Sequence, residues 1–167
     1  MTDVRIVHLS GPVFDALAAG EPAPAPVPLS PYLTGPECRG VWRRRSEQCA
    51  RDPEAAAWVT GVIWDAAAGV AVGRAGFHAP PDAGGMVEIG YAVDPAYRRR
   101  GYARAALELL LARARSDSRV RRVRVSIRPD NVASHDLAMQ YGFVKVGEQW
   151  DDEDGLELVY EICHDEP

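Results

Sequence analysis

The sequence predicts a mixed α/β domain in which a mostly antiparallel central sheet is flanked by helices and ends in a C-terminal β-hairpin. Three observations support this fold class. The 167 residues, 47% of them hydrophobic and 26% charged, are typical of a globular protein that can bury a core. Short strand-like segments alternate with segments of helical periodicity. Between residues 86 and 114, one stretch changes from the first pattern to the second. We expect residues 1–167 to form a single domain.

The stretch from Met86 to Ala114 is the centre of the predicted fold. Residues 86–93 are apolar and rich in strand formers, and Asp94-Pro95 ends this strand before helical spacing begins. The helix has one apolar stripe, formed by Ala103, Ala106, Leu107, Leu110, Leu111 and Ala114. The stripe predicts a helix that packs on the core and holds the preceding turn in place.

Three further strands and two helices are expected before this stretch. The strands are predicted at residues 4–9, 58–64 and 70–77. A short helix runs to Leu17, and a second begins at a capping box, Thr34–Glu37. The prolines of residues 21–36 indicate an extended loop between these helices. Arg43–Arg45 are expected on the solvated side of the second helix, without a functional role.

The C-terminal part is predicted to add a strand, a helix and a hairpin. Residues 122–128 alternate between apolar and polar side chains, as in a strand with one buried face. Pro129-Asp-Asn131 ends this strand and caps a helix over residues 132–141, which Gly142 closes. The hairpin strands are expected at residues 143–149 and 156–162, joined by an acidic turn.

Charge is distributed unevenly along the chain. The formal net charge is −5, yet 11 arginines lie between residues 98 and 128, and nine acids with no Lys or Arg lie between residues 148 and 167. This asymmetry indicates a polyanionic ligand at one side of the fold and favours a cationic one at the other. Nucleic acid is a weaker candidate for the anion, because the chain is acidic overall and lacks interleaved aromatic and basic residues.

The N-terminal residues show no secretory signal, and no apolar segment is long enough to cross a membrane. The three cysteines, Cys38, Cys49 and Cys163, have neither disulfide-framework nor metal-site spacing. We therefore expect a cytoplasmic protein with reduced thiols, no bound metal and no membrane partner.

The start of the central helix has the chemistry of an anion site. Backbone N–H groups at a helix N-terminus lack intrahelical partners and lie at the positive end of the helix dipole. A glycine there permits close approach of a ligand, and a pyrophosphate would fit. The residues are Arg98, Arg99, Arg100, Gly101, Tyr102 and Ala103. The spacing excludes a Walker loop and a GxGxxG dinucleotide loop.

Two motifs resemble those of the GNAT N-acetyltransferase superfamily. Arg98-x-x-Gly101-x-Ala103, placed after a strand and a proline turn, resembles the acyl-CoA motif of that superfamily. Residues 128–143, RPDNVASHDLAMQYGF, resemble its second signature. Within the superfamily, the EIGYAV strand and the N-x-x-S helix are most similar to the branch of ribosomal-protein alanine N-acetyltransferases.

The resemblance implies that acetyl-CoA is the co-substrate. Backbone groups of Tyr91, Ala92 and Val93 would pair with its pantetheine arm and polarise the acetyl carbonyl. Amides from Arg98 to Ala103 would hold the pyrophosphate, Arg104 would add charge there, and Asn131 would contact pantetheine.

The resemblance also implies candidates for the chemistry. Many GNAT enzymes place a general-acid Tyr where this chain has Ala138, so Ser134 is the candidate to hydrogen-bond or protonate the departing sulfur. Glu88 is the candidate base, with a purely structural carboxylate as the alternative. Trp64, His78 and Trp150 are candidates for contacts with the acceptor.

The implied function is direct transfer of an acetyl group to a primary amine, either a protein N-terminus or a small molecule. The alternative is a non-catalytic module that binds or senses acyl-CoA, and an Arg-rich nucleic-acid binder is a third, weaker reading. A monomer and a homodimer are both compatible with the sequence.

Overall fold

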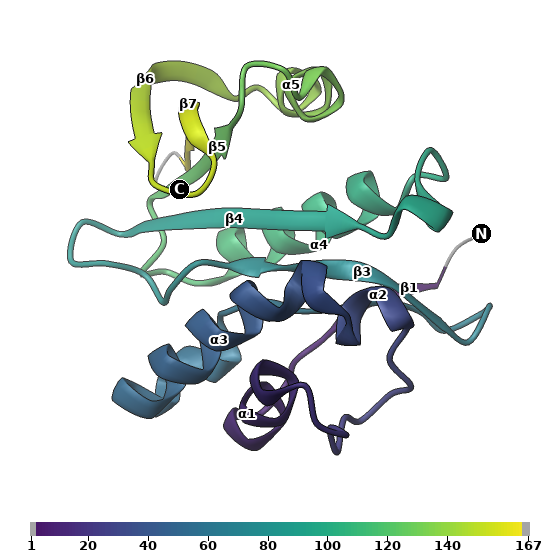
Figure 1. The fold of residues 1–167 in the computed structure, drawn as a ribbon. Helices are drawn as coiled ribbons and strands as arrows, with labels where there is room; N and C mark the ends of the chain where they lie inside the picture. The colour runs from purple at the N-terminus through teal and green to yellow at the C-terminus, as the bar shows by residue number, and fades with distance from the viewer. Residues whose placement is uncertain (1–2, 165–167) are drawn as a thin grey trace.

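A seven-stranded sheet forms the centre of the molecule (Figure 1), and the computed structural model describes it within residues 3–164. The strands lie in the order β1-β2-β3-β4-β5-β7-β6, and β4 and β5 form the parallel pair among otherwise antiparallel neighbours. Their bounds are β1 Val4–Val7, β2 Gly61–Asp65, β3 Val70–Phe77, β4 Met86–Val93, β5 Arg122–Ile127, β6 Val144–Asp151 and β7 Gly155–Cys163. The predicted fold class and order of elements are confirmed.

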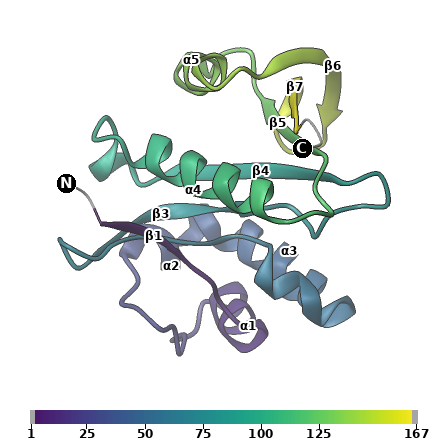
Figure 2. The ribbon, with the colours of Figure 1, turned by 180° about the vertical axis from the view of Figure 1, so that it is seen from behind.

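Helices cover both faces of the sheet and define two hydrophobic clusters. On one face lie α1 (Gly11–Ala19), α2 (Pro31–Thr34) and α3 (Pro36–Arg51), and on the other lie α4 (Tyr102–Ser116) and α5 (Val132–Gln140). Figure 2, seen from behind, shows α4 in front of the strands and α3 beyond them. The sheet thus has a hydrophobic core on each face, and each strand side chain packs against the helices on the face toward which it points.

The apolar stripe of α4 packs as predicted. Ala106, Leu107, Leu110, Leu111 and Ala114 are buried, and the helix is one residue longer at its start than the stripe. Tyr102 occupies that first position with a buried ring, and its hydroxyl donates a 2.7 Å hydrogen bond to Asp65 at the end of β2. The side chain of Tyr102 therefore belongs to the core, and only its backbone amide is available to the anion site.

Three local predictions in the N-terminal half are wrong. The expected strand at residues 58–64 begins only at Gly61, because a 3₁₀-helix over Pro53–Ala57 leads into Trp58. The loop 21–36 contains the short helix α2, which Ser30 caps. Gly35, not Thr34, is the N-cap of α3, and it makes no side-chain capping bond. The Thr34–Glu37 box fails because Thr34 is still the last residue of α2.

The sheet opens between β4 and β5. These strands pair only from Met86–Arg122 to Ile89–Val125, whereas β4 continues to Val93 and remains paired with β3 through Gly73. In Figure 1, the C-terminal strands turn away from β4. The edge of residues 90–93 that faces β5 therefore has no strand partner. Its backbone N–H and C=O groups must find hydrogen-bond partners in a ligand or in solvent.

Candidate functional site

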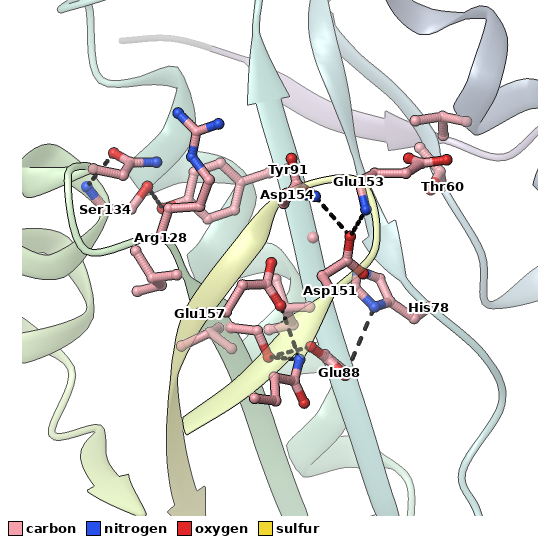
Figure 3. A pocket seen from close by; sticks show the side chains of 18 of the residues that line it. Thr60, His78, Glu88, Tyr91, Arg128, Ser134, Asp151, Glu153, Asp154 and Glu157 are labelled. Carbon is pink, nitrogen blue, oxygen red and sulfur yellow. Dashed lines mark hydrogen bonds and ion pairs between the residues drawn. The ribbon is translucent and has the colours of Figure 1, made fainter. Parts of the chain in front are cut away.

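A cleft of about 790 Å³ lies where β4 and β5 diverge. Its walls come from α3 and β3 in the N-terminal half and from β5, α5 and the β6–β7 turn in the C-terminal half. Figure 3 shows Glu88, His78, Asp151 and Glu157 gathered in one part of this space, with Arg128 and Ser134 in another. These residues are far apart in the chain, and the order of the strands in the sheet brings them together.

Strand alternation places the floor of the cleft on the face that α3 covers. Arg74 of β3 and His78, the residue after β3, lie on this face together with Glu88 and Gly90 of β4, since alternate residues share a face and Gly76 pairs with Gly90. A Cβ at Gly90 would meet Nε2 of His78 at 2.6 Å. Glycine at this position thus leaves room for the imidazole above the strand.

Glu88 is held at the centre of the floor. Its side chain is 17% exposed, and Oε1 accepts a 2.6 Å hydrogen bond from Ser126 Oγ of β5. Oε2 lies 3.7 Å from Nδ1 of His78, which is longer than a hydrogen bond. Burial lowers the pKa of His78, and Arg45, Arg44 and Arg74 lower it further, against the opposing effect of Glu88. The imidazole is therefore mainly uncharged near neutral pH.

A chain of hydrogen bonds connects Glu88 to the hairpin. Gln149 Nε2 donates both to Ser126 Oγ at 3.1 Å and to Glu157 Oε2 at 2.8 Å. Burial raises the pKa of Glu157, and the carboxylates of Asp151, Asp154 and Glu88 add to this effect, while Gln149 opposes it. Ser126, Gln149 and Glu157 were not predicted from the sequence. The one signal for Ser126 is its short polar side chain on the less buried face of β5.

The second group of predicted residues meets at the start of α5. Asn131 is the N-cap, and its Oδ1 accepts a 3.2 Å hydrogen bond from the backbone N–H of Ser134. The hydroxyl of Tyr91 donates to Ser134 Oγ at 3.1 Å, and burial raises the pKa of Tyr91. Ala138 is buried one turn further along the helix. Ser134 consequently keeps its own hydroxyl proton free for another acceptor.

The predicted anion site forms a turn at the end of β4. Gly101 is the N-cap of α4 with a φ of 85°, and Arg99 has a φ of 63°, so two positions of the turn are left-handed. Nε of Arg98 donates a 3.1 Å hydrogen bond to the carbonyl of Val93, and Arg100 lies over the ring of Tyr97. The free N–H groups of the first turn of α4 follow directly, at Tyr102 and Ala103.

Arg104 is directed toward α5 and not only toward this turn. Its Nη1 donates to the hydroxyl of Tyr141 at 3.1 Å, and its Nη2 contacts the amide oxygen of Gln140. Both contacts are exposed. A phosphate at the turn would compete with these neutral partners for the guanidinium. The phosphate would be preferred, because a hydrogen bond to an ionised oxygen is stronger than one to a neutral group.

The mouth of the cleft lies between α3 and the acidic turn. Nη1 of Arg44 is 2.5 Å from Oε2 of Glu153, and Oδ1 of Asp151 accepts 2.8 Å hydrogen bonds from the backbone N–H groups of Glu153 and Asp154. These two N–H groups lower the pKa of Asp151. Arg43 and Arg44 are exposed, as predicted, whereas Arg45 is half-buried; both Arg44 and Arg45 line the cleft.

The three residues proposed to contact an acceptor lie in different places. His78 lies beside Glu88, and Trp150 lines the mouth with 74% of its surface exposed. Trp64 does not line the cleft; it is half-buried against the cluster formed by α1 and α3. Within residues 3–164, no three His, Cys, Asp or Glu side chains are grouped to hold a metal ion, and no helix is long and apolar enough to cross a membrane.

A protein family and a curated relative match this chain. Residues 26–144 match the family described as the acetyltransferase (GNAT) domain. An uncharacterized N-acetyltransferase of Bacillus subtilis (strain 168), YjdG, is 37% identical over 73 residues, which span 44% of each chain. The chain therefore spans less than half the length of this curated relative.

Two solved structures share the fold over nearly the whole chain. The ribosomal-protein-S5-alanine acetyltransferase from Vibrio fischeri has a TM-score of 0.65 and 18% identity, with 97% of this chain and 92% of that one covered. The microcin C7 self-immunity acetyltransferase MccE, solved in complex with acetyl-CoA and AMP, has a TM-score of 0.66 and 12% identity, with 96% and 92% covered.

Proposed function

Because the chain belongs to the GNAT acetyltransferase family, we propose that it moves an acetyl group from acetyl-CoA to the nitrogen of a primary amine. One observation carries the proposal: β4 parts from β5 beyond Ile89, with the start of α4 at one end of the opening and Glu88 at the other. A long thin ligand with a charged end suits this arrangement.

The residues around the opening fit acetyl-CoA. The free edge of residues 90–93 offers backbone partners to the amide groups of pantetheine. The N–H groups that begin α4, together with Arg98–Arg100, offer a positive site for pyrophosphate. Asn131 and Arg128 line the same cleft from the β5–α5 connection. Arg98 donates a hydrogen bond to the carbonyl of Val93, which is one of the backbone groups proposed to contact pantetheine.

Acetyl-CoA supplies an acyl group activated as a thioester, and its transfer forms a C–N bond and breaks the C–S bond. The amine must first lose a proton. Glu88 is the proposed acceptor of this proton. The hydrogen bond from Ser126 that holds its carboxylate and the neighbouring, mainly uncharged His78 support this role. Ser134 is placed to give a proton to the departing sulfur, because Tyr91 fills its acceptor site and not its donor.

The acceptor is a primary amine of a protein N-terminus or of a small molecule. An α-amino group has an ordinary pKa of about 7.7–8.0, against about 10.4 for lysine, so more of it is already uncharged near neutral pH. A single carboxylate such as Glu88 can then complete the deprotonation. The proposal therefore favours α-amines over lysine side chains.

Calorimetric titration with acetyl-CoA, followed by a thiol-release assay across amines, tests this function. We expect binding, and thiol release with at least one α-amine. Ser134→Ala should keep the affinity for acetyl-CoA and lower turnover, whereas unchanged turnover would remove Ser134 from the mechanism. Absence of acetyl-CoA binding would overturn the proposal, and binding without release for any amine would favour an acyl-CoA-sensing module.

A further inference from the structure

Two of the three arginines on one wall of the cleft have no carboxylate partner among the described residues. Arg44, Arg45 and Arg74 line it on the side of α3 and β3. Arg44 is paired with Glu153 across the mouth. Within residues 3–164, no carboxylate oxygen lies within ion-pair distance of Arg45 or Arg74, whereas Arg124 elsewhere on the sheet is paired with Glu161.

Arg45 is fixed in place by neutral groups alone. Its Nε donates to Thr60 Oγ1 at 3.1 Å, and its Nη1 donates to Gln48 Oε1 at 2.9 Å and to the carbonyl of His78 at 3.2 Å. Burial lowers the pKa of Arg45 to about 10, and Arg44 and Arg74 contribute to this shift. The fold thus orients a guanidinium that is half removed from water and has no counter-ion.

Arg74 adds an unsatisfied donor to the same wall. It extends from β3 on the face that carries His78, and its Nε is buried without a hydrogen-bond partner. A buried charge that stays unpaired costs free energy, and an anion at the accessible part of these guanidinium groups would supply the missing counter-charge. Perturbed, partly buried charges inside a cleft are a common mark of a binding site.

The acidic side of the cleft is more nearly satisfied. Asp151 accepts two backbone N–H groups, Glu153 pairs with Arg44, and Glu157 accepts from Gln149. The remaining turn residues, Asp152 and Asp154, are exposed to solvent. Carboxylates thus lie on the hairpin side of the cleft, and unpaired guanidinium groups lie on the side of α3 and β3, which fits an acceptor that carries both charges.

We propose that the acceptor is an amino acid-sized molecule whose amine faces Glu88 while its carboxylate binds Arg45 and Arg74. The inference rests on the proposed function and specifies its substrate class. His78 connects the two sites, because its carbonyl receives Arg45 and its ring lies 3.7 Å from Glu88. Glu88 and Arg45 thus contact or flank the same residue from two sides of the cleft. Arginine is well suited to bind carboxylate through two parallel hydrogen bonds.

A panel of the common L-amino acids, each paired with its carboxamide, tests the inference by thiol release with acetyl-CoA. We expect kcat/KM for the preferred amino acid to exceed that of its amide by about tenfold or more, the effect of one or two charge-assisted hydrogen bonds. The comparison is stringent, because amidation lowers the pKa of the amine and so favours the amide in the absence of a carboxylate site.

Variants locate the effect. Arg45→Gln and Arg74→Gln should each reduce the ratio of acid to amide toward one, while Arg45→Lys should retain part of the preference. Arg43→Gln is the matched control, since it removes the same charge from an exposed position on α3. Acetyl-CoA affinity and thermal unfolding, measured on each variant, separate loss of recognition from loss of fold.

Three results would overturn the inference while leaving the proposed function intact: amides used as well as acids, release only with amines that carry no anionic group, and a ratio that neither Gln variant changes. Acetyl-CoA binding without release on any amino acid would also contradict it. Absence of acetyl-CoA binding by the unmodified protein would overturn the proposed function and this inference together.

Discussion

Ser126 is the side chain that fixes the orientation of Glu88. Its hydroxyl donates to one carboxylate oxygen at 2.6 Å and accepts from Gln149 at 3.1 Å, so its proton is committed to Glu88. A carboxylate that must collect a proton from an amine depends on such support, since small misplacements are costly in a reacting geometry. Ser126 acts through Glu88 and is a positioning residue.

Ser126→Ala should lower kcat by about tenfold, because a hydrogen bond to a charged group contributes about 1.5–3 kcal/mol. Ser126→Thr should restore most of the rate, and acetyl-CoA affinity should stay the same in both. The measurement is kcat as a function of pH, with Ser116→Ala at the exposed end of α4 as the control. An unchanged rate and pH profile in Ser126→Ala would contradict this role.

Glu157 should make the fold less stable as pH rises. Burial raises its pKa in the folded state, so its contribution to stability is complete below the ordinary value of 4.5 and is lost as pH rises through the raised value. Glu157→Gln keeps an acceptor for Gln149 and removes the titration. We expect its free energy of unfolding, relative to the unmodified protein, to increase as pH rises above about 4.5.

Urea unfolding at several pH values measures this difference. Glu47→Gln removes the same charge from an exposed position on α3 and serves as the control. A difference that is constant with pH, or that shrinks as pH rises, would show that Glu157 is not destabilised by its burial.

The parts of the site that depend on local sequence were predictable. Glu88, Asn131 and Ser134 lie in short motifs, and the structure places all three on the cleft. Ser126 and Gln149 were not found, because β7 lies between β5 and β6 in the sheet and their contact depends on that order. Arg44 pairs with Glu153, whereas Arg45 has no carboxylate partner among the described residues. This difference likewise depends on the assembled cleft.

At the scale of elements, the turn before α4 combines two requirements in Gly101. The residue has a φ of 85°, which other residues adopt at a cost, and it borders free N–H groups at the helix start. No atom outside its immediate chain neighbours lies within 4 Å of an added Cβ. A side chain there would meet the ligand and not the protein.

Gly101→Glu should abolish measurable acetyl-CoA binding, because it introduces backbone strain and places a carboxylate where pyrophosphate is expected. Gly69→Glu is a close control: Gly69 has a φ of 66°, no atom within 4 Å of its added Cβ, and a position in the β2–β3 turn. We expect similar losses of stability, about 1 kcal/mol, in both variants. Calorimetry should detect lost binding in Gly101→Glu alone; equal affinities would place the pyrophosphate elsewhere.

Element boundaries show where sequence periodicity is sufficient. The stripe of α4 predicted the helix because its six apolar residues recur at intervals of three and four residues. The boundary between α2 and α3 was missed because Pro31 and Pro36 each begin a helix, and only four residues lie between them. The divergence of β4 from β5 has no local signal, since both strands continue as regular extended chain beyond their last pair.

At the scale of the whole molecule, the cleft separates the N-terminal layer from the C-terminal hairpin. Arg44 of α3 and Glu153 of the β6–β7 turn bridge it, 109 residues apart in the chain. Both side chains are largely exposed, so the pair contributes little to global stability. Its effect is local: it holds the acidic turn toward α3, over the space in which an acceptor would meet Glu88.

Arg44→Glu should therefore loosen the turn without unfolding the protein. Repulsion between the introduced carboxylate and Glu153 removes the bridge, and we expect faster hydrogen exchange over residues 151–155 with a change of less than about 1 kcal/mol in the free energy of unfolding. The double variant Arg44→Glu with Glu153→Arg restores opposite charges and should restore slow exchange. Arg43→Glu, one residue away and outside the cleft, should leave exchange in the turn unchanged. Exchange that does not respond to Arg44→Glu would mean that the backbone bonds to Asp151 hold the turn unaided.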